Sequence, residues 1–187
     1  MRIGIIGQKW LASAVFDALV NDHEIAYVAA PSSDDRLYRS GACLGIEAIA
    51  YSVEGLSRLE CFSLDLIVCA HAHVFVPASV RDTASFCIGY HPSLLPLHRG
   101  KRAIEDTVAA GDKIAGGSIY HLNDELDAGA VAFQEWCFVR SGETAAELWR
   151  RALGPLGVEL ISRAANHLEA YGFIPASDQE CLEAVSA

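Results

Sequence analysis

The sequence predicts an α/β fold, in which a mostly parallel, twisted sheet carries helices on both faces. Hydrophobic residues make up 52% of the chain and charged residues 20%, which is enough apolar material for a sheet buried under helices. Short β-branched runs alternate with segments of helical spacing, a pattern typical of parallel strands joined by crossover helices. The length of 187 residues fits one domain, so we expect a single domain over 1–187.

The N-terminal segment has the pattern of a strand, a turn and a helix. Residues 2–7 form a β-branched run that ends in glycine, and apolar residues recur at helical spacing over 10–20. Residues 24–30 form the second expected strand. This beginning is Rossmann-like, but Gly4-x-x-Gly7 is not the full dinucleotide fingerprint and predicts no NAD site.

Two later strands are expected to bring polar residues to one edge of the sheet. Residues 64–70 form the most apolar run, which suits a central strand buried on both faces, and residues 86–90 form the next strand. The segments that follow them, 71–76 and 91–96, should lie beyond the carboxyl ends of these strands. Open α/β sheets bind ligands there, so we expect the functional site in these two segments.

The second half of the chain predicts one helix and a strand pair. Residues 103–110 have helical character and stop at Gly111, whereas 118–122 and 130–138 are expected strands joined by the polar stretch 123–129.

A long helical part is expected over 142–171. Thr144 and Glu147 have the spacing of a capping box at its start, and the Gly-Pro pair at 154–155 should interrupt it. Residues 172–187 are expected to form a tail.

Composition and charge exclude several classes of protein. The formal net charge of −10 opposes binding to nucleic acid, and the longest apolar stretch, 64–80, falls short of the ~20 residues that span a bilayer. The six cysteines form no Cys-x-x-Cys pair, which favours reduced thiols, and no secretory leader is expected. We therefore expect a cytoplasmic protein with no nucleic-acid or membrane partner.

Two segments carry the chemistry. Residues 89–100 read Gly-Tyr-His-Pro-Ser-Leu-Leu-Pro-Leu-His-Arg-Gly, and residues 116–129 run from a strand into an acidic turn that ends in Asp-x-Gly. Together they resemble the two signature segments of the formyltetrahydrofolate-dependent formyltransferase family. That family includes the glycinamide ribonucleotide, methionyl-tRNA and amino-sugar formyltransferases. The resemblance extends over about residues 1–138 and implies a formyltransferase-type version of the predicted fold.

The resemblance implies transfer of a formyl group from 10-formyltetrahydrofolate to a small amine. The motif histidine matches His91 and the motif aspartate matches Asp127. An amine that attacks a formyl carbon creates an oxyanion and must lose a proton. A histidine can stabilise the oxyanion, and a carboxylate can hold the imidazole protonated and help to move protons. His91 and Asp127 are therefore the expected catalytic residues, although an aspartate before Gly129 also suits a plain turn.

One residue of the family motif is missing. The family has asparagine two positions before the motif histidine, and this chain has Gly89. Loss of a preorganised oxyanion donor costs ~10²- to 10³-fold in turnover, so either another donor substitutes or the chemistry is altered or lost. The auxiliary candidates are Tyr120, at a position where the family often has histidine, and His71 and His73. Tyr90 should point to the opposite face of its strand.

The resemblance also implies where ligands bind. The segment after the central strand receives the folate pterin in the family, and the expected cofactor-binding residues are Ala72, His73, Val74, Val76, Asn123 and Asp124. Arg99 and Lys101 are candidates for an anionic acceptor or the folate tail, and a solvated basic turn is the alternative interpretation. The expected partners are a folate and an unidentified small amine, and a homodimer is left open.

Three other functions remain open at this point. Water as the acceptor would give a formyltetrahydrofolate hydrolase or deformylase. A degenerate family member would bind a folate or nucleotide without turnover. Three histidines, His71, His73 and His91, with Asp127 could also suit Zn²⁺, although we expect no metal.

Overall fold

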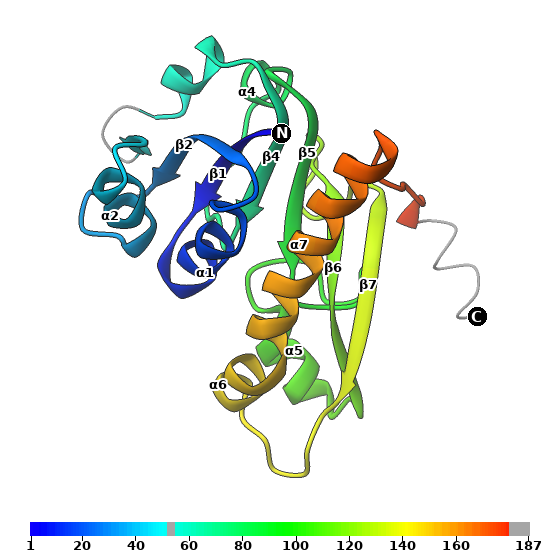
Figure 1. Cartoon of the computed structure of the whole chain (residues 1–187). Coiled ribbons are helices and arrows are strands. Elements are labelled where there is room, and N and C mark those ends of the chain that lie inside the picture. The colour runs from blue at the N-terminus through cyan, green and yellow to red at the C-terminus, as the bar shows by residue number, and fades with distance from the viewer. Residues whose placement is uncertain (52–54, 180–187) are drawn as a thin grey trace. The chain divides into compact units, whose positions relative to one another are not determined.

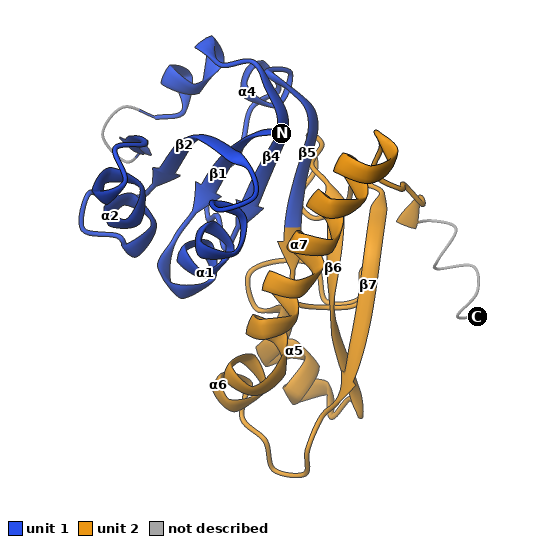
Figure 2. Ribbon diagram, in the orientation of Figure 1, with its two compact units in different colours: residues 1–89 blue, residues 90–187 orange. Residues whose placement is uncertain are grey.

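The computed structural model describes residues 1–51 and 55–179. The chain forms two compact units, Met1–Gly89 and Tyr90–Ala187 (Figure 2). Strand β5, Ala84–His91, contributes to both units. The single domain over 1–187 stays a prediction, and residues 180–187 of the predicted tail lie outside the described residues.

The first unit contains a parallel sheet. Its strands are β1 (Arg2–Gly7), β2 (Glu24–Ala30), β3 (Glu47–Ala50), β4 (Leu64–Ala70) and β5, in the order β3-β2-β1-β4-β5. All four neighbouring pairs are parallel. In the middle of the sheet, Ile5 lies opposite Val28 on one side and Val68 on the other. Strand β4 is buried except at Asp65, as expected for a central strand, and the predicted α/β class with a mostly parallel sheet is confirmed.

The helices of the first unit are α1 (Lys9–Leu19), α2 (Arg36–Cys43), the 3₁₀ helix η1 (Ser57–Cys61) and α4 (Ala78–Arg81). Helix α1 packs against β1, β4 and α2, and buries Leu11, Val15 and Phe16 (Figure 1). Asp35 caps the N-terminus of α2, and its Oδ1 accepts a hydrogen bond of 2.9 Å from the Leu37 backbone N–H. The sequence patterns did not predict α2 and β3.

The second unit combines a hairpin with helices. Strands β6 (Ile114–His121) and β7 (Val131–Phe138) are antiparallel, and α5 (Ala103–Ala110) precedes them. A short helix α6 (Ala145–Leu148), a π-helix η2 (Trp149–Leu153) and α7 (Gly154–Tyr171) follow. Helix α7 packs against β6 and β7 (Figure 1).

Glycines allow Tyr90 to pack closely inside the second unit. A Cβ atom at Gly157 of α7 would lie 2.7 Å from Tyr90 Cε1, and one at Gly117 of β6 would overlap the same ring. The Tyr90 hydroxyl donates a hydrogen bond of 2.6 Å to the Leu153 carbonyl at the end of η2. The tyrosine therefore joins the strand that carries His91 to the helical segment.

The predicted start and interruption of the helical part are both confirmed. The Thr144 side chain accepts from the Glu147 N–H, and the Glu147 carboxylate accepts from the Thr144 N–H at 2.9 Å, which completes the capping box. The π-helical turn over 149–153 ends where the Gly-Pro pair begins α7. Within the described ranges, no helix is long and apolar enough to cross a bilayer.

Candidate active site

His91 is the last residue of β5 and is buried, with 6% of its surface exposed. Its Nε2 lies 2.9 Å from the His98 carbonyl oxygen. Since a carbonyl only accepts, Nε2 carries a proton and donates it. Its Nδ1 lies 3.5 Å from Asp127 Oδ2. The two ring nitrogens therefore face two acceptors, the His98 carbonyl and the Asp127 carboxylate.

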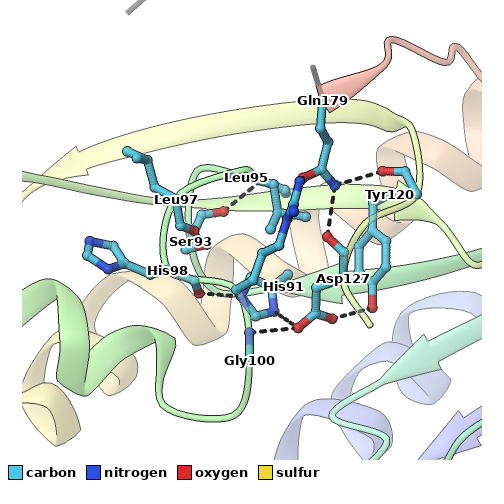
Figure 3. A network of polar contacts seen from close by, with 12 residues as sticks. His91, Ser93, Leu95, Leu97, His98, Gly100, Tyr120, Asp127 and Gln179 are labelled. Carbon is cyan, nitrogen blue, oxygen red and sulfur yellow. Dashed lines mark hydrogen bonds and ion pairs between the residues drawn. The ribbon is translucent and has the colours of Figure 1, made fainter. Parts of the chain in front are cut away.

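Asp127 presents a carboxylate that is fixed at both oxygens (Figure 3). Oδ2 accepts a hydrogen bond of 2.9 Å from the Gly100 N–H, and Oδ1 accepts one of 2.8 Å from the Tyr120 hydroxyl. The residue is 7% exposed and has a φ of 52°, which is uncommon for a residue other than glycine. We call His91 and Asp127, the two predicted catalytic residues, the reacting pair. Strand β5 and the turn after β6 bring them together.

The motif loop, residues 92–100, is pinned to β6 through Ser118. The Ser118 hydroxyl donates to the Ser93 carbonyl at 2.6 Å and accepts from the Leu95 N–H at 3.0 Å. Gln134 Nε2 donates both to this hydroxyl, at 2.9 Å, and to the Leu95 carbonyl, at 2.8 Å. Ser118 is completely buried, so these bonds hold the proline-framed loop in one conformation.

His98 anchors the other end of the motif loop. Its Nε2 lies 2.7 Å from Asp112 Oδ2, and its backbone has a φ of 51°. The His98 carbonyl is the acceptor for His91 Nε2. The orientation of the His91 ring therefore depends on a loop residue that is itself tied to the chain after α5.

The chain matches a known family over most of its length. The profile of the formyl transferase family matches residues 47–164. This chain belongs to the formyl transferase family. Cytosolic 10-formyltetrahydrofolate dehydrogenase of Xenopus tropicalis is 30% identical over 174 residues, which are 85% of this chain but 19% of that protein. The chain therefore spans about a fifth of the length of that relative.

Two further comparisons give the same family and fold. Methionyl-tRNA formyltransferase of Bartonella bacilliformis is 34% identical over 119 residues, which are 63% of this chain and 38% of that protein. The crystal structure of glycinamide ribonucleotide transformylase 1 from Symbiobacterium toebii superposes with a TM-score of 0.81 at 22% identity, over 96% of this chain and 92% of that one. At this identity the structural likeness establishes the fold alone.

This member of the formyl transferase family departs from the family motif at Gly89 and Tyr120. Gly89 lies in β5 opposite Cys69 of β4, two residues before His91 and on the same face of the strand. Tyr120, which the sequence predicted as an auxiliary residue, contacts Asp127 directly. The oxyanion donor expected at position 89 is therefore absent from the side chain there, whereas the tyrosine has a defined partner.

The acidic turn, residues 123–129, contains two predicted cofactor-binding residues. Asn123 Oδ1 accepts a hydrogen bond of 3.0 Å from the Glu125 N–H, which is the arrangement of an Asx turn. Asn123 and Asp124 are both exposed. Their contact with a folate stays a prediction of the family resemblance.

The predicted pterin segment belongs to the first unit. His71 follows β4 with a φ of 55°, and its ring meets His73 edge-on with 4.7 Å between centroids. Burial lowers the pKa of His71 to about 4, and the charges of His73 and Lys9 push it in the same direction. His71 is therefore neutral at pH 7, and an auxiliary role for it or for His73 stays a prediction.

The rest of that segment is mostly apolar. Val76 is buried, Ala72 and Val74 are half-buried, and the Val76 carbonyl accepts a hydrogen bond of 2.7 Å from Arg81 Nη1. Their contact with the pterin stays a prediction as well. Among residues 1–51 and 55–179, no group of three or more His, Cys, Asp or Glu side chains is arranged to hold a metal ion.

The two basic candidates have different surroundings. Lys101 is exposed. Arg99 donates through Nε and Nη2 to Gln179 Oε1, at 3.0 and 2.6 Å. Binding of an anion by either residue stays a prediction. The sequence patterns missed Gln179, because a glutamine in the expected tail belongs to no motif and no periodic run.

Proposed function

We propose that this protein transfers a formyl group from 10-formyltetrahydrofolate to a small amine, with His91 and Asp127 at the reacting centre. The observation that carries the proposal is the buried contact between His91 Nδ1 and Asp127 Oδ2 at 3.5 Å. Membership of the formyl transferase family and the similarity to proteins named for 10-formyltetrahydrofolate support the choice of donor. The acceptor is a small amine of unidentified structure.

The geometry supports different roles for His91 and Asp127 in the reaction. The Nδ1–Oδ2 distance of 3.5 Å is longer than the ~2.8 Å of a strong charged hydrogen bond, so this contact leaves Nδ1 available to a substrate oxygen. We assign Nδ1–H of His91 as the donor to the oxyanion that forms when the amine attacks the formyl carbon. Asp127 then receives the proton that the amine loses and gives it to the folate nitrogen as the bond between that nitrogen and the formyl carbon breaks.

A hydrolase is the second candidate, because the reacting pair does not by itself select an amine over water as the acceptor. The same pair would serve if water attacked the formyl carbon, with formate and tetrahydrofolate as products. A protein that only binds a folate is the third outcome. The reacting pair is intact, so we favour an enzyme over a binding protein.

Turnover of 10-formyltetrahydrofolate by the purified protein tests the proposal. Tetrahydrofolate and formate are followed with and without a panel of small amines and amino-sugar nucleotides. Amine-dependent tetrahydrofolate formation is expected, with a loss of at least ~10²-fold in His91→Ala and Asp127→Asn. Glu125→Gln is the matched control, because this exposed carboxylate lies in the same acidic turn.

Each of the other results has a distinct meaning. Formate release that needs no amine identifies the hydrolase. Tight folate binding without turnover identifies the binding protein. Turnover that survives both substitutions contradicts the assignment of the reacting pair.

A further inference from the structure

The chain after α7 returns to the reacting pair. Helix α7 ends at Tyr171, and Gly172 follows in the left-handed conformation with a φ of 77°. His121 Nε2 donates to the Pro175 carbonyl at 2.8 Å, and Ser177 pairs with Val131 through two backbone hydrogen bonds of 2.8 and 2.9 Å. These contacts fasten the segment 172–179 to the ends of β6 and β7.

Gln179 occupies the end of this segment and points toward Asp127 (Figure 3). Its Nε2 donates to the backbone carbonyls of Asp127 and Gly129, both at 2.8 Å. Its Oε1 accepts from Arg99 Nε and Nη2, at 3.0 and 2.6 Å. With 3% exposure, the carboxamide uses both of its hydrogens and both lone pairs inside the protein.

The partners fix the orientation of this amide. A guanidinium only donates and a carbonyl only accepts, so the oxygen must face Arg99 and the nitrogen must face the acidic turn. A carboxylate at this position would set an acceptor against two carbonyls, and an apolar side chain would leave the carbonyls of Asp127 and Gly129 without this donor. Position 179 therefore requires a carboxamide, because another polar side chain would not supply both the donors and the acceptor.

Gln179 connects the two chain segments that hold the reacting pair. Arg99 precedes Gly100, whose N–H binds the Asp127 carboxylate, and follows His98, whose carbonyl binds His91. The Gln179 amide nitrogen also donates to the backbone carbonyl of Asp127, a residue with an uncommon φ of 52°. One side chain thus joins the motif loop to the acidic turn.

We infer that Gln179 is a positioning residue, which sets the distance between His91 and Asp127 by clamping the motif loop to the acidic turn. The inference rests on the proposed function for its kinetic consequence. Gln179 acts through Arg99 and the Asp127 backbone. Displacement of a reacting group by about 1 Å costs up to ~10²-fold in rate, so the clamp governs turnover more than ligand affinity.

The test compares Gln179→Met, which keeps the size, and Gln179→Glu, which keeps the shape, with Asp178→Asn as an exposed neighbour in the same segment. With 10-formyltetrahydrofolate, kcat is expected to fall about 10- to 100-fold in both Gln179 variants, with KM changed by less than about 3-fold. Asp178→Asn should match the wild type in kcat and KM.

A second measurement does not depend on turnover. The ¹⁵N resonances of the His91 imidazole, assigned by their loss in His91→Ala, should shift in Gln179→Met and stay in place in Asp178→Asn. Arg99→Lys weakens only the contact between residue 99 and Gln179 Oε1, so it should shift the same resonances less.

The two proposals can fail separately. Absence of turnover in the wild type counts against formyl transfer, while the imidazole resonances still test the clamp. Wild-type kcat and unshifted His91 resonances in Gln179→Met, even with a lower Tm, would reduce Gln179 to a structural role and overturn the inference.

Discussion

The Tyr120 hydroxyl donates a hydrogen bond of 2.8 Å to Asp127 Oδ1, while its ring stands edge-on to His91 with 6.5 Å between centroids. Asp127 therefore uses one oxygen for the tyrosine and turns the other toward the histidine. The side chain that replaces the family's frequent histidine at position 120 fixes the rotation of the carboxylate.

Tyr120→Phe is expected to lower kcat about 10- to 100-fold. A hydrogen bond to a charged group is worth ~1.5 to 3 kcal/mol, and each 1.4 kcal/mol of lost transition-state stabilisation is about tenfold in rate. Tyr120→His should retain more activity, because an imidazole can also donate to Asp127. The measurement is tetrahydrofolate formation, beside the exposed control Tyr171→Phe. Full activity in Tyr120→Phe would show that the hydroxyl does not orient the carboxylate.

Removal of the Tyr90 hydroxyl should destabilise the protein, whereas removal of the Tyr27 hydroxyl should not. Tyr27 is completely buried, and its hydroxyl has no hydrogen-bond partner among the described residues. Tyr27→Phe is expected to leave the free energy of unfolding unchanged or to raise it by up to about 1 kcal/mol. Tyr90→Phe should lower it by about 1 to 3 kcal/mol, because the Leu153 carbonyl loses its donor. Urea unfolding measures both free energies. An equal loss of stability in the two variants would contradict the conclusion that, of these two hydroxyls, only that of Tyr90 has a hydrogen-bond partner in the described part of the chain.

The Glu143–Arg151 ion pair should make stability depend on acid. Arg151 Nε lies 2.6 Å from Glu143 Oε1, and hydrogen bonding to Arg151 lowers the pKa of Glu143 from 4.5 to about 2. Because the folded pKa lies below the unfolded value, the stabilisation is full above about pH 5 and is lost between 4.5 and 2. Thermal unfolding of Glu143→Gln should therefore differ from the wild type at pH 7 and converge with it near pH 2.

An exposed ion pair provides the control for that experiment. Glu135 and Arg163 are 2.9 Å apart, with side chains 44% and 51% exposed. Such pairs contribute little, so Glu135→Gln should change Tm only slightly at any pH. Equal changes in Tm for Glu143→Gln and Glu135→Gln would mean that the Glu143 effect comes from the change in net charge and not from the ion pair.

The low pKa of His71 should make the first unit less stable in mild acid. Burial lowers its pKa from 6.5 to about 4, so between these values the unfolded chain binds a proton that the folded chain does not. Stability is then expected to decline as the pH falls from about 6.5 to 4. NMR titration of the His71 ring should give a midpoint near 4, and His71→Gln should flatten this part of the stability profile. A midpoint near 6.5 would contradict the burial argument.

The strongest parts of the fold and the site could be predicted from sequence because their signals are local. The run 64–70 is apolar throughout since both faces of β4 are covered, and the capping box needs only Thr144 and Glu147 at the right spacing. His91 and Asp127 stand in two short motifs, so the residues around them were enough to select both as candidate catalytic residues, and the structure brings them into contact.

Other parts depend on contacts that no local pattern encodes. Strand β6 begins at Ile114 rather than at 118, because the glycines at 116 and 117 weaken the strand signal while they make room for Leu94 and Tyr90. Helix α2 buries only Leu37 and Gly41, which leaves almost no apolar stripe to detect. Gln179 binds backbone carbonyls at a sequence distance of 52 from Asp127, so only the folded chain reveals it.

That separation has a consequence for synthesis on the ribosome. At about 5 to 20 residues per second, the codon for Gln179 is translated roughly 3 to 10 s after that for Asp127. During this interval the nascent chain already contains both signature motifs. The Gln179 side chain, which joins them in the folded protein, has not yet been synthesised. All the strands from β1 to β7 are therefore synthesised before the residue that joins the two motifs.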